Sequence, residues 1–125
     1  MATILYKLGR YFEQEEYTAM SMRMLQSMQS KFAGYPSGYS QWLQLQILVT
    51  FGLNTICITG DEAIKIKLQF NAHYLPNVIF AGGISASIPM MQNKVSIGNN
   101  DIHICSADSC MPPIATVEEA IKLLA

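Results

Sequence analysis

Two cysteines near the carboxyl end, Cys105 and Cys110, are the residues with the clearest capacity for chemistry. The residues Ser-Ala-Asp-Ser separate them, so one tight loop after a strand could hold both thiols. Such a pair either exchanges disulfides or supplies half of a metal site, with His103 as its neighbour. The redox spacing at a helix N-terminus is C-x-x-C, however, and a four-ligand zinc site would need both His103 and His73. We therefore expect structural thiols, and we assign no catalytic residue, metal ligand or cofactor. Cys105, Cys110 and His103 remain the candidates for a thiol-disulfide or metal-linked activity.

The third cysteine, Cys57, lies in a short apolar run that predicts a strand. An unpaired cysteine behaves as a small apolar side chain and buries readily, so we expect Cys57 to be packing. Three cysteines are also an odd count, and the chain has no visible secretory signal. A disulfide framework is therefore not expected.

Two weaker signals concern sugar or phosphate binding. Gly60 and the pair Gly82-Gly83 follow predicted strands, where phosphate loops lie in α/β folds. Neither matches G-x-G-x-x-G or the P-loop with its lysine, so we expect simple turns. The aromatic side chains around a Pro-Ser-Gly turn could stack on a sugar ring, but packing is the more common use. They are Tyr35, Tyr39 and Trp42.

Charge is scarce along the chain. Only 14% of the 125 residues are Asp, Glu, Lys or Arg, against about 25% in an average domain, and none of these lies between Lys31 and Asp61. The net charge of -1 is spread without basic blocks, which argues against nucleic acid as a partner. The least polar segment, residues 45–58, is too short for the roughly 20 apolar residues that span a bilayer. We expect no membrane partner and a cytoplasmic location.

Hydrophobic periodicity divides the chain into a helical part and an α/β part. Apolar residues at helical spacing predict helices over residues 3–13, from Glu15 to about residue 33, and from about residue 37 to Phe51. The later pattern predicts strands 55–59, 78–81 and 101–106, with helices over 63–74 and from Val117 onward and a short helix over 88–94. Asp61 is the expected cap of the helix over 63–74, and Thr116 with Glu119 forms the capping box of the last helix.

We therefore predict an α+β chain with two parts. Residues 1–52 form antiparallel helices, and residues 53–125 form a small three-layer α/β unit with a mostly parallel three-stranded sheet.

An ordered series of short motifs resembles one known family. The series is Leu8-Gly9-Arg10, Tyr35-Pro36-Ser37-Gly38-Tyr39, Thr59-Gly60-Asp61, Tyr74-Leu75-Pro76-Asn77, Cys105-x4-Cys110-Met111-Pro112-Pro113 and Val117-Glu118-Glu119. It is similar to the carboxyl-terminal end of thioredoxin-domain-containing proteins of the spermatogenesis-associated protein 20 type. The resemblance covers nearly the whole chain, and Cys105 and Cys110 match the late cysteine pair of that family.

The resemblance implies a role for each part of the chain. Proteins of that family carry a thioredoxin-like domain, then an α/α toroid similar to N-acylglucosamine 2-epimerases and six-hairpin glycosidases, then a short α/β extension. Residues 1–52 would be the last toroid helices, and residues 53–125 would be the extension packed on them. The implied partners are the upstream toroid helices and the thioredoxin-like domain. We therefore expect a non-catalytic role in packing or interaction, with self-association through exposed apolar helices.

Overall fold

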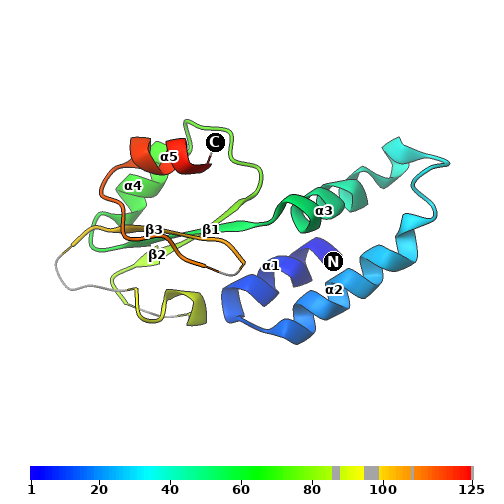
Figure 1. Ribbon diagram of the computed structural model, residues 1–125, viewed down its shortest axis with the longest axis horizontal. Coiled ribbons are helices and arrows are strands. Elements are labelled where there is room, and N and C mark those ends of the chain that lie inside the picture. Colours follow the sequence, from blue (N-terminus) through cyan, green and yellow to red (C-terminus); the bar gives the residue numbers. More distant parts are fainter. Residues whose placement is uncertain (86–87, 95–98, 108, 125) are drawn as a thin grey trace. The chain divides into compact units, whose positions relative to one another are not determined.

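The computed structural model describes residues 1–85, 88–94, 99–107 and 109–124, and these form two compact units, Met1–Gly52 and Leu53–Ala125 (Figure 1). The division falls where the sequence changes from helical to strand periodicity, so the predicted parts 1–52 and 53–125 match these units. Gly52 adopts a positive φ of 88° at the junction, a conformation that favours glycine.

The first unit consists of three α-helices and a short 3-10 helix, η1. They are α1 (Ala2–Phe12), α2 (Glu15–Gln29), η1 (Pro36–Tyr39) and α3 (Ser40–Phe51). Glu15 and Glu16 lie in the first turn of α2, where carboxylates stabilise the positive end of the helix dipole. The second and third helices are shorter than predicted, because α2 ends at Gln29 and η1 occupies the Pro-Ser-Gly turn.

Helices α1 and α2 pack through small residues. Gly9 is buried, and a Cβ at this position would collide with Thr18 Oγ1 and lie 3.1 Å from the backbone oxygen of Gln14. One turn further along α2, the buried Ser21 Oγ donates a hydrogen bond to the carbonyl of Ala2 at 2.7 Å. The absence of side-chain bulk on α1 therefore allows the two backbones to approach closely.

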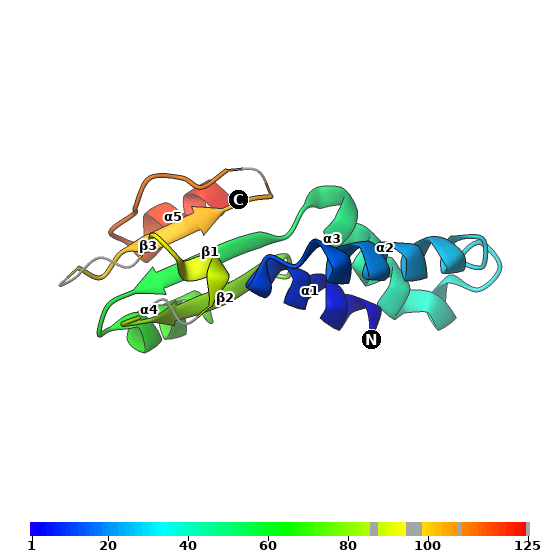
Figure 2. The ribbon, with the colours of Figure 1, turned by 90° about the horizontal axis from the view of Figure 1, so that it is seen from below.

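The second unit is a three-stranded mixed sheet with helices on one face (Figures 1 and 2). Its strands are β1 (Asn54–Thr59), β2 (Val78–Gly83) and β3 (Ile102–Cys105), in the order β2-β1-β3. Its helices are α4 (Ala63–Phe70), a short 3-10 helix η2 (Pro89–Met91) and α5 (Val117–Leu124). The β1–β2 pair is parallel, as expected for strands joined through a helix, whereas β3 runs antiparallel to β1.

The core of this unit lies between the sheet and the helices α4 and α5. Buried isoleucines of β1 and β3 contact Ala63 and Phe70 of α4 and Val117 and Ala120 of α5. The four isoleucines are Ile56, Ile58, Ile102 and Ile104. Both α-helices therefore cover the same face of the sheet, and the predicted three-layer arrangement stays a prediction. Among the described residues, the η2 segment lies over the other face, where the Met90 carbonyl contacts Cys57.

Two helix ends differ from the sequence prediction. Helix α4 ends at Phe70 rather than near residue 74, and Asp61 does not cap it. Instead, Asn100 Oδ1 accepts a hydrogen bond from the Glu62 amide at 3.1 Å. At α5 the predicted cap is present in part, since Thr116 Oγ1 accepts a bond from the Glu119 amide at 3.4 Å.

Replacing Gly9 by alanine should destabilise the helical unit. The added methyl group must displace Thr18 or separate α1 from α2, and this overpacking outweighs the gain in helix propensity, for a net loss of about 1–2 kcal/mol. Urea denaturation followed by circular dichroism measures the change. Gly34→Ala is the matched control, because a Cβ there meets only the Lys31 carbonyl at 4.0 Å. Equal effects of the two variants would contradict the close-approach explanation.

Candidate functional site

The residues of β1 and β3 that could do chemistry lie on the face of the sheet opposite α4 and α5. Successive side chains of a strand alternate between faces, so the isoleucines that enter the core place their neighbours on the other face. Cys57, His103 and Cys105 are buried there. Cys57 and His103 are direct partners in the antiparallel β1–β3 pair, which brings a thiol and an imidazole side by side.

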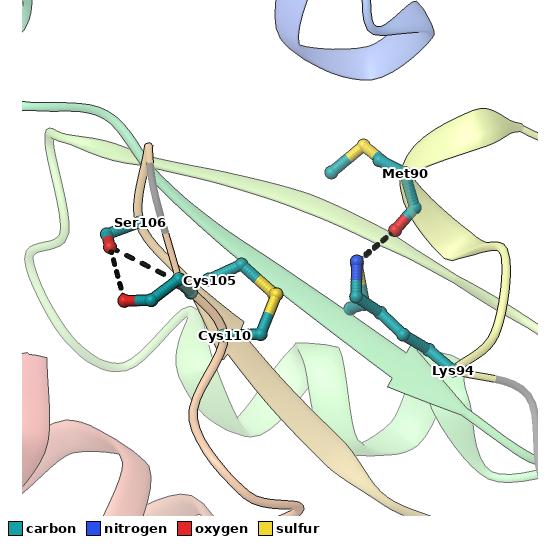
Figure 3. The surroundings of a disulfide bond; sticks show 7 residues. Met90, Lys94, Cys105, Ser106 and Cys110 are labelled. Atoms are coloured by element: carbon teal, nitrogen blue, oxygen red, sulfur yellow. Dashed lines mark hydrogen bonds between the residues drawn. A yellow bond between two sulfur atoms is a disulfide. The ribbon is translucent and has the colours of Figure 1, made fainter.

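Cys105 and Cys110 form a disulfide bond with a Cα–Cα distance of 4.0 Å (Figure 3). The expectation of two unpaired structural thiols is therefore wrong. The odd count of cysteines argued against a disulfide framework, but it does not exclude one bridge that leaves Cys57 as the free, buried thiol. The two cysteines oppose each other because the chain turns back after β3 and pairs with it through an antiparallel bridge between them.

Backbone hydrogen bonds hold this loop on both sides of the disulfide. The Ser106 amide donates to the Ser109 carbonyl at 2.9 Å, and the Met111 amide donates to the Ile104 carbonyl at 2.8 Å. Ser106 Oγ also lies 3.3 Å from the Ser109 carbonyl (Figure 3). A disulfide that closes so short a loop removes little entropy from the unfolded chain. In the chain-entropy model it stabilises the folded state by about 2 kcal/mol. The disulfide is therefore one of several restraints on the loop.

The two sulfur-bearing residues differ sharply in exposure. Cys105 lies at the end of β3 with 5% of its surface exposed, whereas Cys110 is exposed. Of the two linked residues, Cys110 is therefore the one that lies at the surface.

Lys94 and Met90 lie over Cys57 on the same face of the sheet. The Lys94 ammonium donates a hydrogen bond to the Met90 carbonyl (Figure 3). The Cys57 thiol donates to the same carbonyl at 3.6 Å. Burial raises the pKa of the Cys57 thiol, and the positive charge of Lys94 lowers it to a smaller extent. Cys57 is thus held as a protonated thiol, as the sequence prediction of a packing role implies.

His103 is 9% exposed, and its Nε2 atom has no hydrogen-bond partner among the described residues. Burial lowers the pKa of this imidazole, while the negative charge of Asp101 raises it to a lesser degree. His103 is therefore mainly neutral near pH 7. It lies on the face opposite Ile102 and Ile104, as the alternation of the strand predicted.

A metal site is not formed by the described part of the chain. No group of three or more His, Cys, Asp and Glu side chains lies close enough there to hold an ion. The sulfurs of Cys105 and Cys110 are bonded to each other and so cannot ligate as thiolates. The exposed His73 follows the end of α4, away from β3 in the sequence.

The ends of the parallel strands offer little to a phosphate. The Gly60 amide donates to the Gly83 carbonyl at 3.2 Å, and the Glu62 amide donates to Asn100 Oδ1. Both amides are therefore already used in hydrogen bonds within the chain. Beside them lies a hollow of about 600 Å³ whose walls are largely apolar. Lys67 also lines this hollow, and its ammonium donates a hydrogen bond to Asn71 Oδ1. Apolar side chains that line it are Ile58, Ile64, Phe80 and Ile84.

The aromatic residues near η1 are divided between packing and solvent. Trp42 packs against the core formed by Ala2, Leu25 and Leu45. The Tyr39 ring contacts the Phe32 ring, with centroids 6.0 Å apart, whereas Tyr35 is exposed beside Gly38. Two of the three candidate stacking rings are therefore used within the helical unit.

No protein-family model, curated protein or solved structure matches this chain in the three comparisons. The family resemblance of the motifs therefore remains a prediction. None of the helices in the described ranges is long and apolar enough to cross a membrane.

Sequence reasoning missed two contributors to these sites. Asn100 caps α4 from a distant loop, and Lys94 lies against Cys57 and His103. The alternation of apolar and polar residues in β1 and β3 was visible, but the register that pairs Cys57 with His103 was not.

The stability of the α/β unit should fall on acidification because of His103. An imidazole whose folded pKa is below its ordinary value of 6.5 binds fewer protons in the folded state than in the unfolded state. The free energy of unfolding is therefore fully maintained above that value and decreases as the pH falls towards the folded pKa. Urea denaturation at about pH 7.5 and about pH 5.5 measures the decrease. This fall in the free energy of unfolding should be smaller in His103→Gln than in the parent chain, and the control His73→Gln should show the same fall as the parent. A fall in His103→Gln as large as that of the parent would contradict the role given to His103.

Proposed function

We propose that this chain is a non-catalytic packing module, whose helical unit completes a larger array of α-helices. The array in question is the toroid of the thioredoxin-domain-containing family that the motifs resemble. The observation that carries the proposal is the distribution of large and small side chains on α1 and α3.

Helix α1 buries its small residues and leaves large apolar ones uncovered. Ala2 and Gly9 are the buried residues of α1, whereas Ile4 is 56% exposed and Phe12 is also exposed. Amphipathic helices in a self-sufficient unit normally turn their large apolar residues towards the core. Leu5 and Leu8 of the same stripe are half-buried, so packing within the unit covers only part of the apolar stripe that predicted α1.

Helix α3 carries large apolar side chains on every side, among uncharged polar ones. Residues Trp42 to Phe51 place large apolar side chains in every direction, given 100° of rotation per residue. Leu45 and Leu48 are buried, but Ile47 is 53% exposed and Phe51 is exposed. A helix with large apolar side chains on every side and no charged residue is typical of the interior of a larger assembly.

The charge pattern supports the same interpretation. Residues 32–60 include η1, α3 and the whole of β1, and none of them is charged. Exposed helix faces in isolated domains usually carry charged residues, which discourage association. The uncharged helix α3 is therefore better suited to a contact with further helices than to solvent.

An isolated chain of this kind should self-associate, and Ile47→Glu should weaken the association. The new carboxylate would have to be buried without a partner, which is strongly unfavourable. Sedimentation velocity over a range of concentrations should show oligomers for the parent chain and a shift towards monomer for the variant. Ile4→Glu tests the surface of α1 in the same way.

Gln44→Glu is the matched control, since it adds the same charge at an exposed polar position of α3. It should leave the association unchanged. A parent chain that stays monomeric at its highest attainable concentration, and does not bind a dye for exposed apolar surface, would contradict the proposal.

A further inference from the structure

We propose that the Cys105–Cys110 disulfide is a reversible redox site that exchanges with thiols in solution, with Cys110 as the sulfur they attack. This site lies in the α/β unit and is independent of the helical packing role. The inference depends on the unequal exposure of the two cysteine residues and on the backbone contacts that keep them opposed.

The direction of attack follows from exposure. Cys105 is buried at the end of β3, on the face opposite α4 and α5, whereas Cys110 is exposed. Cys110 belongs to the return segment, residues 109–114, in which the chain runs back antiparallel to β3. Exchange requires a thiolate to approach one sulfur along the bond while the other sulfur leaves. An incoming thiolate therefore reaches Cys110 Sγ, and Cys105 Sγ is the leaving group.

The reaction can be written as two exchanges with a dithiol. In the first, one thiolate of the dithiol forms a bond to Cys110 Sγ, the Cys105–Cys110 bond breaks, and the electron pair stays on Cys105 Sγ, which takes up a proton. In the second, the other thiolate of the dithiol attacks its own bound sulfur and releases the Cys110 thiolate. The dithiol is oxidised to a disulfide, and the cysteine pair is reduced by two electrons.

The reduced site should keep its geometry. Two hydrogen bonds between Ile102 and Ile114, at 2.9 and 2.8 Å, join β3 to the return segment, and both isoleucines belong to the core. The backbone bonds of Ser106 and Met111 flank the cysteine pair directly. These contacts do not involve sulfur, so they hold the two thiols opposite each other after reduction. Re-formation of the bond is then an intramolecular step between groups already in place.

The free thiol of Cys57 is not part of this exchange. It is buried, and its proton is donated to the Met90 carbonyl. A reagent should therefore detect two new thiols on reduction of the folded chain, and Cys57 should stay unreactive until the chain unfolds.

Reduced glutathione is the direct probe of the attacked sulfur. The oxidised full-length chain is treated with glutathione under native conditions, quenched with acid, and mapped by peptide mass spectrometry. We expect the mixed disulfide on Cys110. A mixed disulfide mainly on Cys105 would overturn the assignment of the attacked sulfur.

Dithiothreitol tests reversibility in the same preparation. We expect two thiols to be released with an unchanged circular dichroism spectrum, and the bond to re-form after the reductant is removed. Reduction that occurs only when the chain is unfolded would identify the bridge as a structural restraint and overturn the proposal. The association state of the helical unit does not enter either measurement.

Single variants provide a quantitative comparison in a Cys57→Ser background, where no third thiol contributes. Cys105→Ser leaves the exposed Cys110 thiol, which should react with Ellman's reagent at least about tenfold faster than the buried thiol left in Cys110→Ser. Equal rates in folded variants would contradict the proposal. If a variant does not fold, the glutathione mapping of the parent chain still decides the question.

Discussion

The structure of the α/β unit depends on the burial of four isoleucines between the sheet and its two α-helices. Ile56 and Ile58 of β1 and Ile102 and Ile104 of β3 all point to one face, where α4 and α5 exclude water from them. Because a strand alternates its side chains, this burial places Cys57, His103 and Cys105 on the other face. Packing of the hydrophobic core on one face of the sheet therefore fixes the positions of these three residues on the opposite face.

The same constraint explains why a disulfide forms in a chain with an odd number of cysteines. Core burial fixes both β3 and Ile114, and the return segment between them has to run antiparallel to β3. This register sets Cys110 opposite Cys105, while Cys57 lies beside His103 under the η2 segment. The bridge is thus a consequence of strand pairing and not of the spacing in the sequence alone.

The helical unit follows a different rule of packing. Its closest contact, between α1 and α2, is made by Gly9, Thr18, Ser21 and Ala2, which bring backbones together but bury little apolar surface. In the same unit, large side chains such as Ile4 of α1 and Ile47 of α3 stay exposed. Burial of apolar area at about 25 cal/mol per Å² is the main source of folding stability, so a unit that leaves such side chains exposed gains by association.

The sequence by itself determined the local features of the molecule. Apolar residues repeating about every 3.6 residues indicated the α-helices, and apolar residues in short runs or at every second position indicated the strands. The change of period after Gly52 marked the division between residues 52 and 53. The alternation of His103 with Ile102 and Ile104 also indicated which face each would take. These features depend on residues close together in the chain, and a pattern of neighbours is sufficient to predict them.

Only the tertiary structure decided the antiparallel direction of β3, the packing of α4 and α5 on one face of the sheet, the hydrogen bond of Asn100 at the start of α4, and the bond between Cys105 and Cys110. It also decided that α1 buries Gly9 in place of its larger apolar residues. Each of these depends on contacts between distant segments, whose geometry is set by how the whole core packs.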